Sequence, residues 1–129
     1  MAKKKRTTKR KTEATRERIL NAAEELFAQR GFEGVTVRQI MRNAEADVAL
    51  AYYHFKSKRD LFDAVLLRHA EVVNAIRLQA LEEVEARHRD DQPSVEEIIA
   101  AFTNPLLQLL VEDHAKWKHY FALIAQINN

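Results

Sequence analysis

The apolar residues of this sequence recur with helical spacing along nearly its whole length. The first apolar stripe follows the positions i, i+3, i+4, i+7 and i+8, and its members are Ile19, Ala22, Ala23, Leu26 and Phe27. Gly31 then provides a stop, because glycine accepts the left-handed conformation in which many helices end. The pattern predicts a first helix over residues 12–29.

Two short helices are predicted next. Thr36 and Gln39 have the spacing of a capping box, so a helix of about two turns is expected to start after Thr36. Asp47 is the candidate N-cap of another short helix, over residues 48–55. Two short helices joined by a turn of about three residues match the helix-turn-helix motif, whose second helix enters the major groove of DNA.

One long helix is predicted to follow. Ser57 and Asp60 form an N-cap signature, and an apolar stripe without a helix breaker extends from Lys58 to about Arg87.

Further helices are predicted beyond the polar loop at residues 89–93. Ser94 and Glu97 have capping-box spacing and start a helix at residue 95. Pro105 is expected to kink or restart this helix, because proline has no N–H to donate. A last helix is expected over residues 114–127, so the predicted fold class is all-α.

The composition agrees with an all-α fold and excludes several other classes. Glycine and proline number two each among 129 residues, too few for the turns of a sandwich or barrel. Cysteine is absent, which excludes disulfides, thiolate nucleophiles and cysteine-bound metals. No apolar run reaches the ~18 residues of a membrane span, and the N-terminus lacks the apolar core of a signal peptide. We expect a cytoplasmic protein that does not bind membranes.

The charge is divided unevenly between the two halves. Residues 1–59 contain 15 Lys and Arg against 7 Asp and Glu, whereas residues 60–129 contain 6 against 12. Residues 1–11 alone carry seven Lys and Arg and no acid, which is typical of a disordered tail that binds polyanions or stays solvated. Because the basic half contains the helix-turn-helix spacing, double-stranded DNA is the favoured partner.

The residues of this half also resemble a known family. ILNAAEELFAQRGFEGVTVRQI, followed by YYHFKSKRDLF, resembles the N-terminal domain of TetR-family transcriptional regulators over roughly residues 12–67. The resemblance implies a three-helix helix-turn-helix domain over 12–57, behind the basic tail over 1–11. Residues 58–129 would then be a long linking helix and part of a ligand-binding and dimerisation domain. The implied function is a homodimeric repressor that binds a palindromic operator and is released by a small-molecule effector.

The resemblance implies DNA-contacting residues on the two short helices and just after them. These residues are Thr36, Arg38, Val48, Ala49, Leu50, Tyr52, Tyr53, His54, Lys56 and Lys58. Thr36 and Arg38 open the helix that lies along the DNA backbone, where the guanidinium can bind phosphate or guanine or stay solvated. Residues 48–50 occupy the first turn of the recognition helix, where apolar side chains contact thymine methyl groups. The remaining residues are assigned to phosphate contacts, with packing as the alternative for Tyr53.

The sequence departs from the family pattern in the turn and at the start of the recognition helix. Glu45 occupies the turn position where the family usually has glycine, although glutamate has no special tolerance of left-handed geometry. Asp47, Val48 and Ala49 replace a usual Ser-Lys/Arg-Gly, so hydrogen-bond donors to bases are few. DNA shape and phosphate contacts are therefore expected to contribute more to recognition.

The last two predicted helices carry a set of apolar residues with two possible roles. They form the core or line a pocket for a small apolar effector, and they are Phe102, Leu106, Leu110, Trp117, Tyr120 and Phe121. The five histidines lack metal-ligand spacing, so no metal and no cofactor is expected. The family usually continues through further helices that form the dimer interface, so the chain is expected to be truncated at its C-terminal end. Dimerisation of this chain therefore stays open.

Two other classes of function remain as alternatives. An enzyme is disfavoured, because the sequence has no phosphate-binding glycine loop, no nucleophile elbow and no zinc motif. A helical interaction module with a polyanion-binding basic tail is the competing interpretation.

Overall fold

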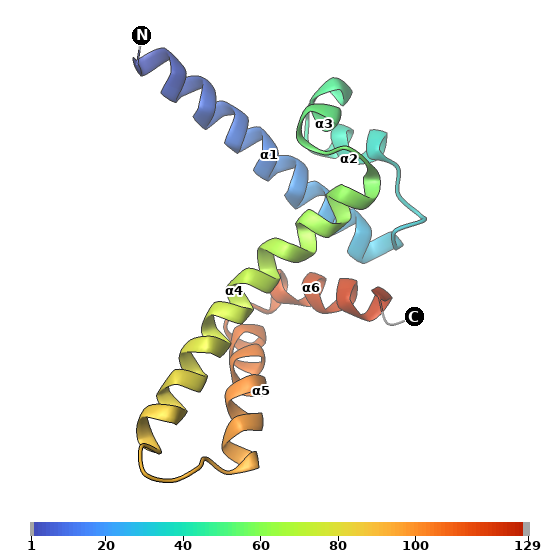
Figure 1. Ribbon diagram of the computed structural model, residues 1–129. Coiled ribbons are helices and arrows are strands. Elements are labelled where there is room, and N and C mark those ends of the chain that lie inside the picture. The colour runs from blue at the N-terminus through green and yellow to red at the C-terminus, as the bar shows by residue number, and fades with distance from the viewer. Residues whose placement is uncertain (1, 128–129) are drawn as a thin grey trace. The chain divides into compact units, whose positions relative to one another are not determined.

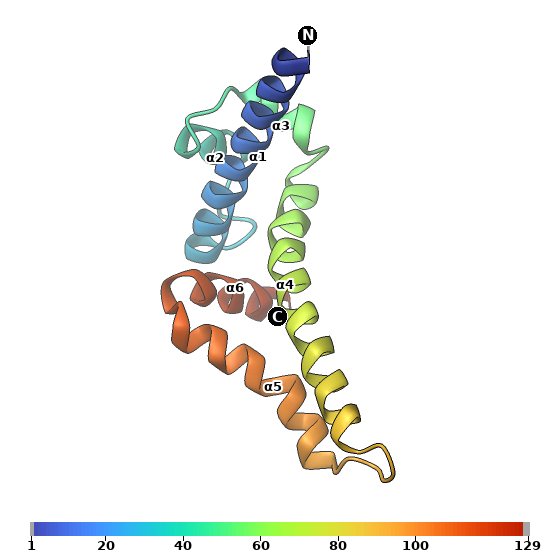
Figure 2. The same ribbon diagram turned by 90° about the vertical axis from the view of Figure 1, so that its left-hand side faces the viewer.

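The computed structural model describes residues 2–127, with the side chains of all of these except residues 2–4 and 7. The described residues form six α-helices and no strand, which confirms the all-α prediction (Figures 1 and 2). They divide into two compact units, one made of residues 2–66 and 122–127 and the other of residues 67–121. Within residues 2–127, none of the helices is both long and apolar enough to span a bilayer.

The first unit contains α1 (Ala2–Arg30), α2 (Val37–Asn43), α3 (Val48–His54), the start of α4 (Lys58–Arg87) and the end of α6 (His114–Ile127). Its core contains the predicted stripe of α1, all of whose members are buried. The start of α4 adds Leu61, Phe62 and Val65 to this core. This packing places residues 58–66 in the first unit, whereas the predicted domain boundary lies before Lys58.

Aromatic rings occupy the centre of this core. Phe27 is fully buried, and its ring centroid lies 5.2 Å from that of Phe62 in an edge-to-face arrangement and 5.8 Å from that of Phe32. Two residues of α6 complete the unit. Leu123 is fully buried, and the Gln126 side-chain amide donates to the Phe27 carbonyl at 2.9 Å.

The predicted end of α1 at Gly31 and the predicted start of α2 at Thr36 are confirmed. Gly31 has a φ of 77° and donates its N–H to the Phe27 carbonyl, as expected of a residue that ends a helix. Thr36 and Gln39 form both hydrogen bonds of a capping box, at 3.1 and 3.0 Å. Gly34 is also required, because a Cβ there would stand 2.3 Å from the Arg30 carbonyl oxygen.

The first helix is longer than the sequence analysis expected. Residues 2–11, interpreted there as a disordered tail, continue α1 back to Ala2. The physical reason is that residues 2–30 contain neither glycine nor proline. Lysine and arginine are good helix formers, and extending a helix avoids the cost of nucleating one.

The second unit contains the rest of α4, α5 (Val95–Glu112) and the start of α6. Val73, Val84, Ala101, Trp117 and Tyr120 are buried within it. The expectation that the helix restarts at Pro105 is wrong, because α5 continues through this residue. One missing N–H interrupts a single hydrogen bond, while the helix on both sides keeps its own.

His88 connects the end of α4 to the following loop and to the start of α5 through two carboxylates. His88 Nδ1 lies 2.9 Å from an Asp91 carboxylate oxygen, and Nε2 lies 2.8 Å from a Glu97 carboxylate oxygen. The hydrogen bond to Glu97, followed by that to Asp91, raises the pKa of His88 above its ordinary value. The stabilisation that protonated His88 gives the fold is therefore fully present below the pKa of this histidine in the unfolded chain. It is lost as the pH rises through the raised pKa of the folded protein.

Candidate DNA-binding surface

Helix α3 presents three different sides. Ala51 is buried in the core, and Phe55 is buried just after the helix ends. Leu50, Tyr53 and His54 line a small cavity of about 150 Å³ on the side that faces α1.

The third side of α3 points away from the protein. Val48, Ala49 and Tyr52 lie on it at positions i, i+1 and i+4, and all three are exposed. The residues predicted to contact DNA therefore divide into an outward set and a set that lines the side toward α1.

The start of α2 presents the predicted polar contacts. Thr36 and Arg38 are exposed, and the Thr36 hydroxyl oxygen accepts from the Gln39 N–H. The hydroxyl hydrogen can still be donated to a phosphate, because the capping bond uses only an oxygen lone pair. Helix α2 can thus offer one hydroxyl and one guanidinium to a DNA backbone.

Lys58 is occupied within the protein. Its ammonium donates to the carbonyls of Phe32 at 2.9 Å and Val35 at 3.1 Å, and it lies 4.3 Å from the centroid of the Phe32 ring. An ammonium has three N–H donors, so one is left for a phosphate. Lys56, by contrast, is exposed two residues earlier.

The structure adds Arg16 and Arg18 of α1 to the surroundings of the motif. The Arg16 guanidinium lies 5.3 Å from the centroid of the Phe55 ring. Burial, followed by the positive charge of Arg16, lowers the pKa of His54, so its imidazole is neutral near pH 7. Arg18 Nε donates to the Ala44 carbonyl in the turn between α2 and α3, at 3.3 Å. Sequence reasoning missed both arginines, because helical spacing alone does not say which basic residue of α1 reaches the turn.

Comparison with known proteins agrees with this arrangement. A model of the family described as "Bacterial regulatory proteins, tetR family" matches residues 19–65. This range contains the whole buried stripe of α1, both short helices and the start of α4. Residues 19–65 thus form a DNA-binding domain of the TetR family. The predicted resemblance is thereby confirmed.

Three curated relatives illustrate the similarity. The chain is 39% identical over 57 residues to the "HTH-type transcriptional regulator UidR" of Escherichia coli (strain K12), a match that covers 44% of the chain and 29% of the relative. It is 33% identical over 76 residues to the "HTH-type transcriptional repressor NemR" of the same strain, covering 59% and 38%. It is 32% identical over 108 residues to the "HTH-type transcriptional repressor BepR" of Brucella suis biovar 1 (strain 1330), covering 84% and 48%. The chain thus spans less than half the length of these relatives.

Glu45 is a strained residue in the helix-turn-helix turn of this TetR-family domain. It has a φ of 53°, in the left-handed region that glycine adopts without steric cost. Its N–H donates to the Arg42 carbonyl at 3.1 Å, and its carboxylate is exposed. The family usually has glycine at this position, and the backbone geometry explains why glycine suits it.

Glu45→Gly is therefore expected to stabilise the first unit by about 1 kcal/mol, because it removes the left-handed strain. It should also tighten binding to duplex DNA, because it removes a carboxylate that repels phosphate. Urea unfolding and DNA titration measure the two effects. Glu45→Ala is the matched control, since it removes the charge but keeps a Cβ: it should tighten DNA binding with little gain in stability. Equal stability of the two variants would contradict the assignment of strain.

The second unit contains a separate cavity of about 440 Å³ between α4 and α5. Its lining is partly polar and includes Glu83, Arg87, Glu97, Asn104 and Gln108. None of the six residues suggested by the sequence as a pocket lining takes part in this cavity. Two of these six, Trp117 and Tyr120, are buried and pack their rings against His69, at centroid distances of 5.2 and 5.5 Å. The pocket formed by the six residues stays a prediction.

Proposed function

We propose that this chain is the DNA-binding part of a transcriptional repressor of the TetR family. The observation that carries the proposal is the exposed side of α3, where Tyr52 is 68% exposed beside Val48 and Ala49. Large apolar and aromatic side chains on the outer face of a seven-residue helix contribute little to the core, whereas they suit contacts with base edges. Membership of the family supports DNA as the partner and disfavours an enzyme. A regulator of this kind acts where the chromosome is, so we place it in the cytoplasm.

DNA recognition is proposed to combine few base contacts with several phosphate contacts. Val48 and Ala49 would face the major groove, with Leu50 at its edge. Tyr52 lies on the same outward side of α3, so we propose a base contact for it in place of the phosphate contact that the resemblance implies. Thr36, Arg38, Tyr53, His54, Lys56 and the remaining donor of Lys58 would bind phosphates. Neutral His54 keeps one ring N–H to donate.

Two finer features are part of the same proposal. A homodimer would place two copies of α3 in successive major grooves of a palindromic operator. A small effector bound by the second unit would release the repressor. The cavity between α4 and α5 supports an effector that carries a polar group as well as apolar surface, rather than a wholly apolar one, because carboxylates, a guanidinium and amides line it.

The test is selection of the sequences that this chain binds from random duplex DNA. Enrichment of a palindromic sequence is the expected result. As a matched control, a variant in which both Tyr52 and Val48 are alanine should bind duplexes with little enrichment. Equal binding of RNA and duplex DNA, or no duplex binding at physiological salt, would overturn the proposal. Either result would favour a helical interaction module with a basic N-terminal segment instead.

A further inference from the structure

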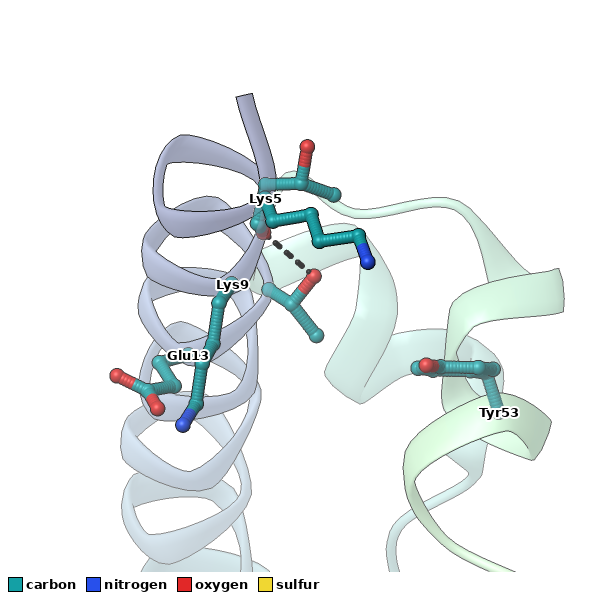
Figure 3. Close-up of a pocket in the computed structure, with 6 residues that line it drawn as sticks. Lys5, Lys9, Glu13 and Tyr53 are labelled. Atoms are coloured by element: carbon teal, nitrogen blue, oxygen red, sulfur yellow. Dashed lines mark hydrogen bonds between the residues drawn. The ribbon is translucent and has the colours of Figure 1, made fainter. Parts of the chain in front are cut away.

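The first turns of α1 form one wall of a groove whose other wall belongs to α3. Lys5, Thr8, Lys9 and Thr12 lie on one side of α1, at positions i, i+3, i+4 and i+7. Together with Glu13 and Tyr53 they line an open groove of about 690 Å³. Figure 3 shows Lys5 extending toward α3 and the Tyr53 ring extending from α3 toward α1. The ring is 75% exposed, so its face is available to a ligand.

This side of α1 is not a packing face. Its members are ammonium and hydroxyl groups, whereas a helix that packs on a core presents an apolar stripe. The Thr12 hydroxyl donates to the Thr8 carbonyl at 2.9 Å, and the Thr15 hydroxyl donates in the same way to the Lys11 carbonyl. These hydroxyl hydrogens are engaged, so the lysines are the donors that the groove offers to an anion.

The charge of this helical segment also favours an anionic partner. The first turn of α1 contains no acidic residue, and residues 1–11 carry seven Lys and Arg. Cations at the start of a helix repel one another and the positive end of the helix dipole. A bound polyanion removes both kinds of repulsion.

We propose that the first three turns of α1 are a second DNA-binding element, which holds a sugar–phosphate strand in the groove between α1 and α3. Lys5 and Lys9 bind its phosphates, and the Tyr53 ring covers the sugar. The inference rests on the proposed DNA-binding function and extends it to a surface outside the helix-turn-helix motif.

The position of the groove supports this occupant over a free anion. The groove is continuous with the smaller cavity lined by Lys11, Leu50 and His54, since Thr8, Thr12 and Tyr53 belong to both. A strand held there would run beside the recognition helix. Glu13 also lines the groove and would repel phosphate, so the strand would lie toward the Lys5 end.

The experiment measures binding of the intact chain to a fluorescein-labelled duplex of mixed sequence, over a series of salt concentrations. Replacing both Lys5 and Lys9 with alanine is expected to weaken binding roughly tenfold and to reduce the log–log salt slope by about two. Glu13→Gln is expected to act in the opposite direction and tighten binding. Replacing Tyr53 with alanine should reduce the effect of the lysine pair, because the groove then lacks one wall.

The matched control replaces both Arg6 and Arg10 with alanine. It removes the same charge from the same helix, but neither arginine lines the groove. It is expected to weaken binding less than the lysine pair does. Equal losses of DNA affinity from the two double substitutions would overturn the proposal that the groove binds a strand. They would indicate nonspecific attraction by the basic segment. If the wild-type chain binds DNA and the lysine double variant binds it equally well, the inference alone is overturned. If the wild-type chain binds no duplex, the proposed function is overturned as well. Circular dichroism verifies that each variant keeps its helices.

Discussion

Replacing Phe27 with alanine is expected to lower the free energy of unfolding of the first unit by about 3–5 kcal/mol. The ring is fully buried between those of Phe32 and Phe62, so truncation leaves a cavity and removes two aromatic contacts. A small domain has only about 5–15 kcal/mol of stability, so the loss is a large share of the total. The measurement is urea unfolding followed by circular dichroism, and loss of DNA binding should accompany it.

The control for Phe27 is a phenylalanine outside this core. Phe102 is 53% exposed in the second unit, where the Arg77 guanidinium lies 3.8 Å from the centroid of its ring. Phe102→Ala is expected to cost about 1 kcal/mol or less, because it removes one exposed cation–π contact and little buried surface. Similar losses from the two substitutions would mean that the aromatic cluster is not the centre of stability.

The sequence was sufficient for those helix ends that carry a local signal. Thr36 with Gln39, Asp47 and Gly31 each act on backbone groups within four residues, so spacing alone reveals them. The buried stripe of α1 was predictable for the same reason, since a helix repeats every 3.6 residues. Continuation of α1 through residues 2–11 was missed, because a block of like charges is also typical of disorder.

The details of the site depended on contacts that sequence spacing does not encode. Lys58 meets the carbonyls of residues 32 and 35, which precede it by more than 20 positions. Arg18 reaches the turn at Ala44 over 26 positions. Such pairs depend on how the helices cross, and crossing angles follow from packing rather than from any local motif.

Lys58→Ala is expected to destabilise the first unit by about 2 kcal/mol, as well as weakening DNA binding. Its ammonium donates to two carbonyls of the loop between α1 and α2, so the side chain joins the start of α4 to that loop. The expected loss is below the sum for two fully buried charge-assisted bonds, because the side chain is half-buried and water can replace part of each bond. Lys58→Met tests the charge itself, since it keeps an unbranched chain over the Phe32 ring and should restore little of the stability.

Lys56→Ala is the matched comparison for Lys58→Ala, because it removes the same charge from an exposed side chain two residues earlier. It is expected to leave the urea midpoint unchanged and to reduce the salt slope of DNA binding by about one. Lys58→Ala should move both readouts, so the pair separates holding the domain together from binding the DNA backbone. If Lys58→Ala behaved like Lys56→Ala in both measurements, the two carbonyl contacts would contribute nothing measurable and Lys58 would be a phosphate ligand only.

Because the loop between α1 and α2 precedes the capping residue Thr36, loss of the Lys58 contacts to this loop should also loosen the start of α2. Thr36 and Arg38, which the proposal places against the DNA backbone, would then contribute less to binding.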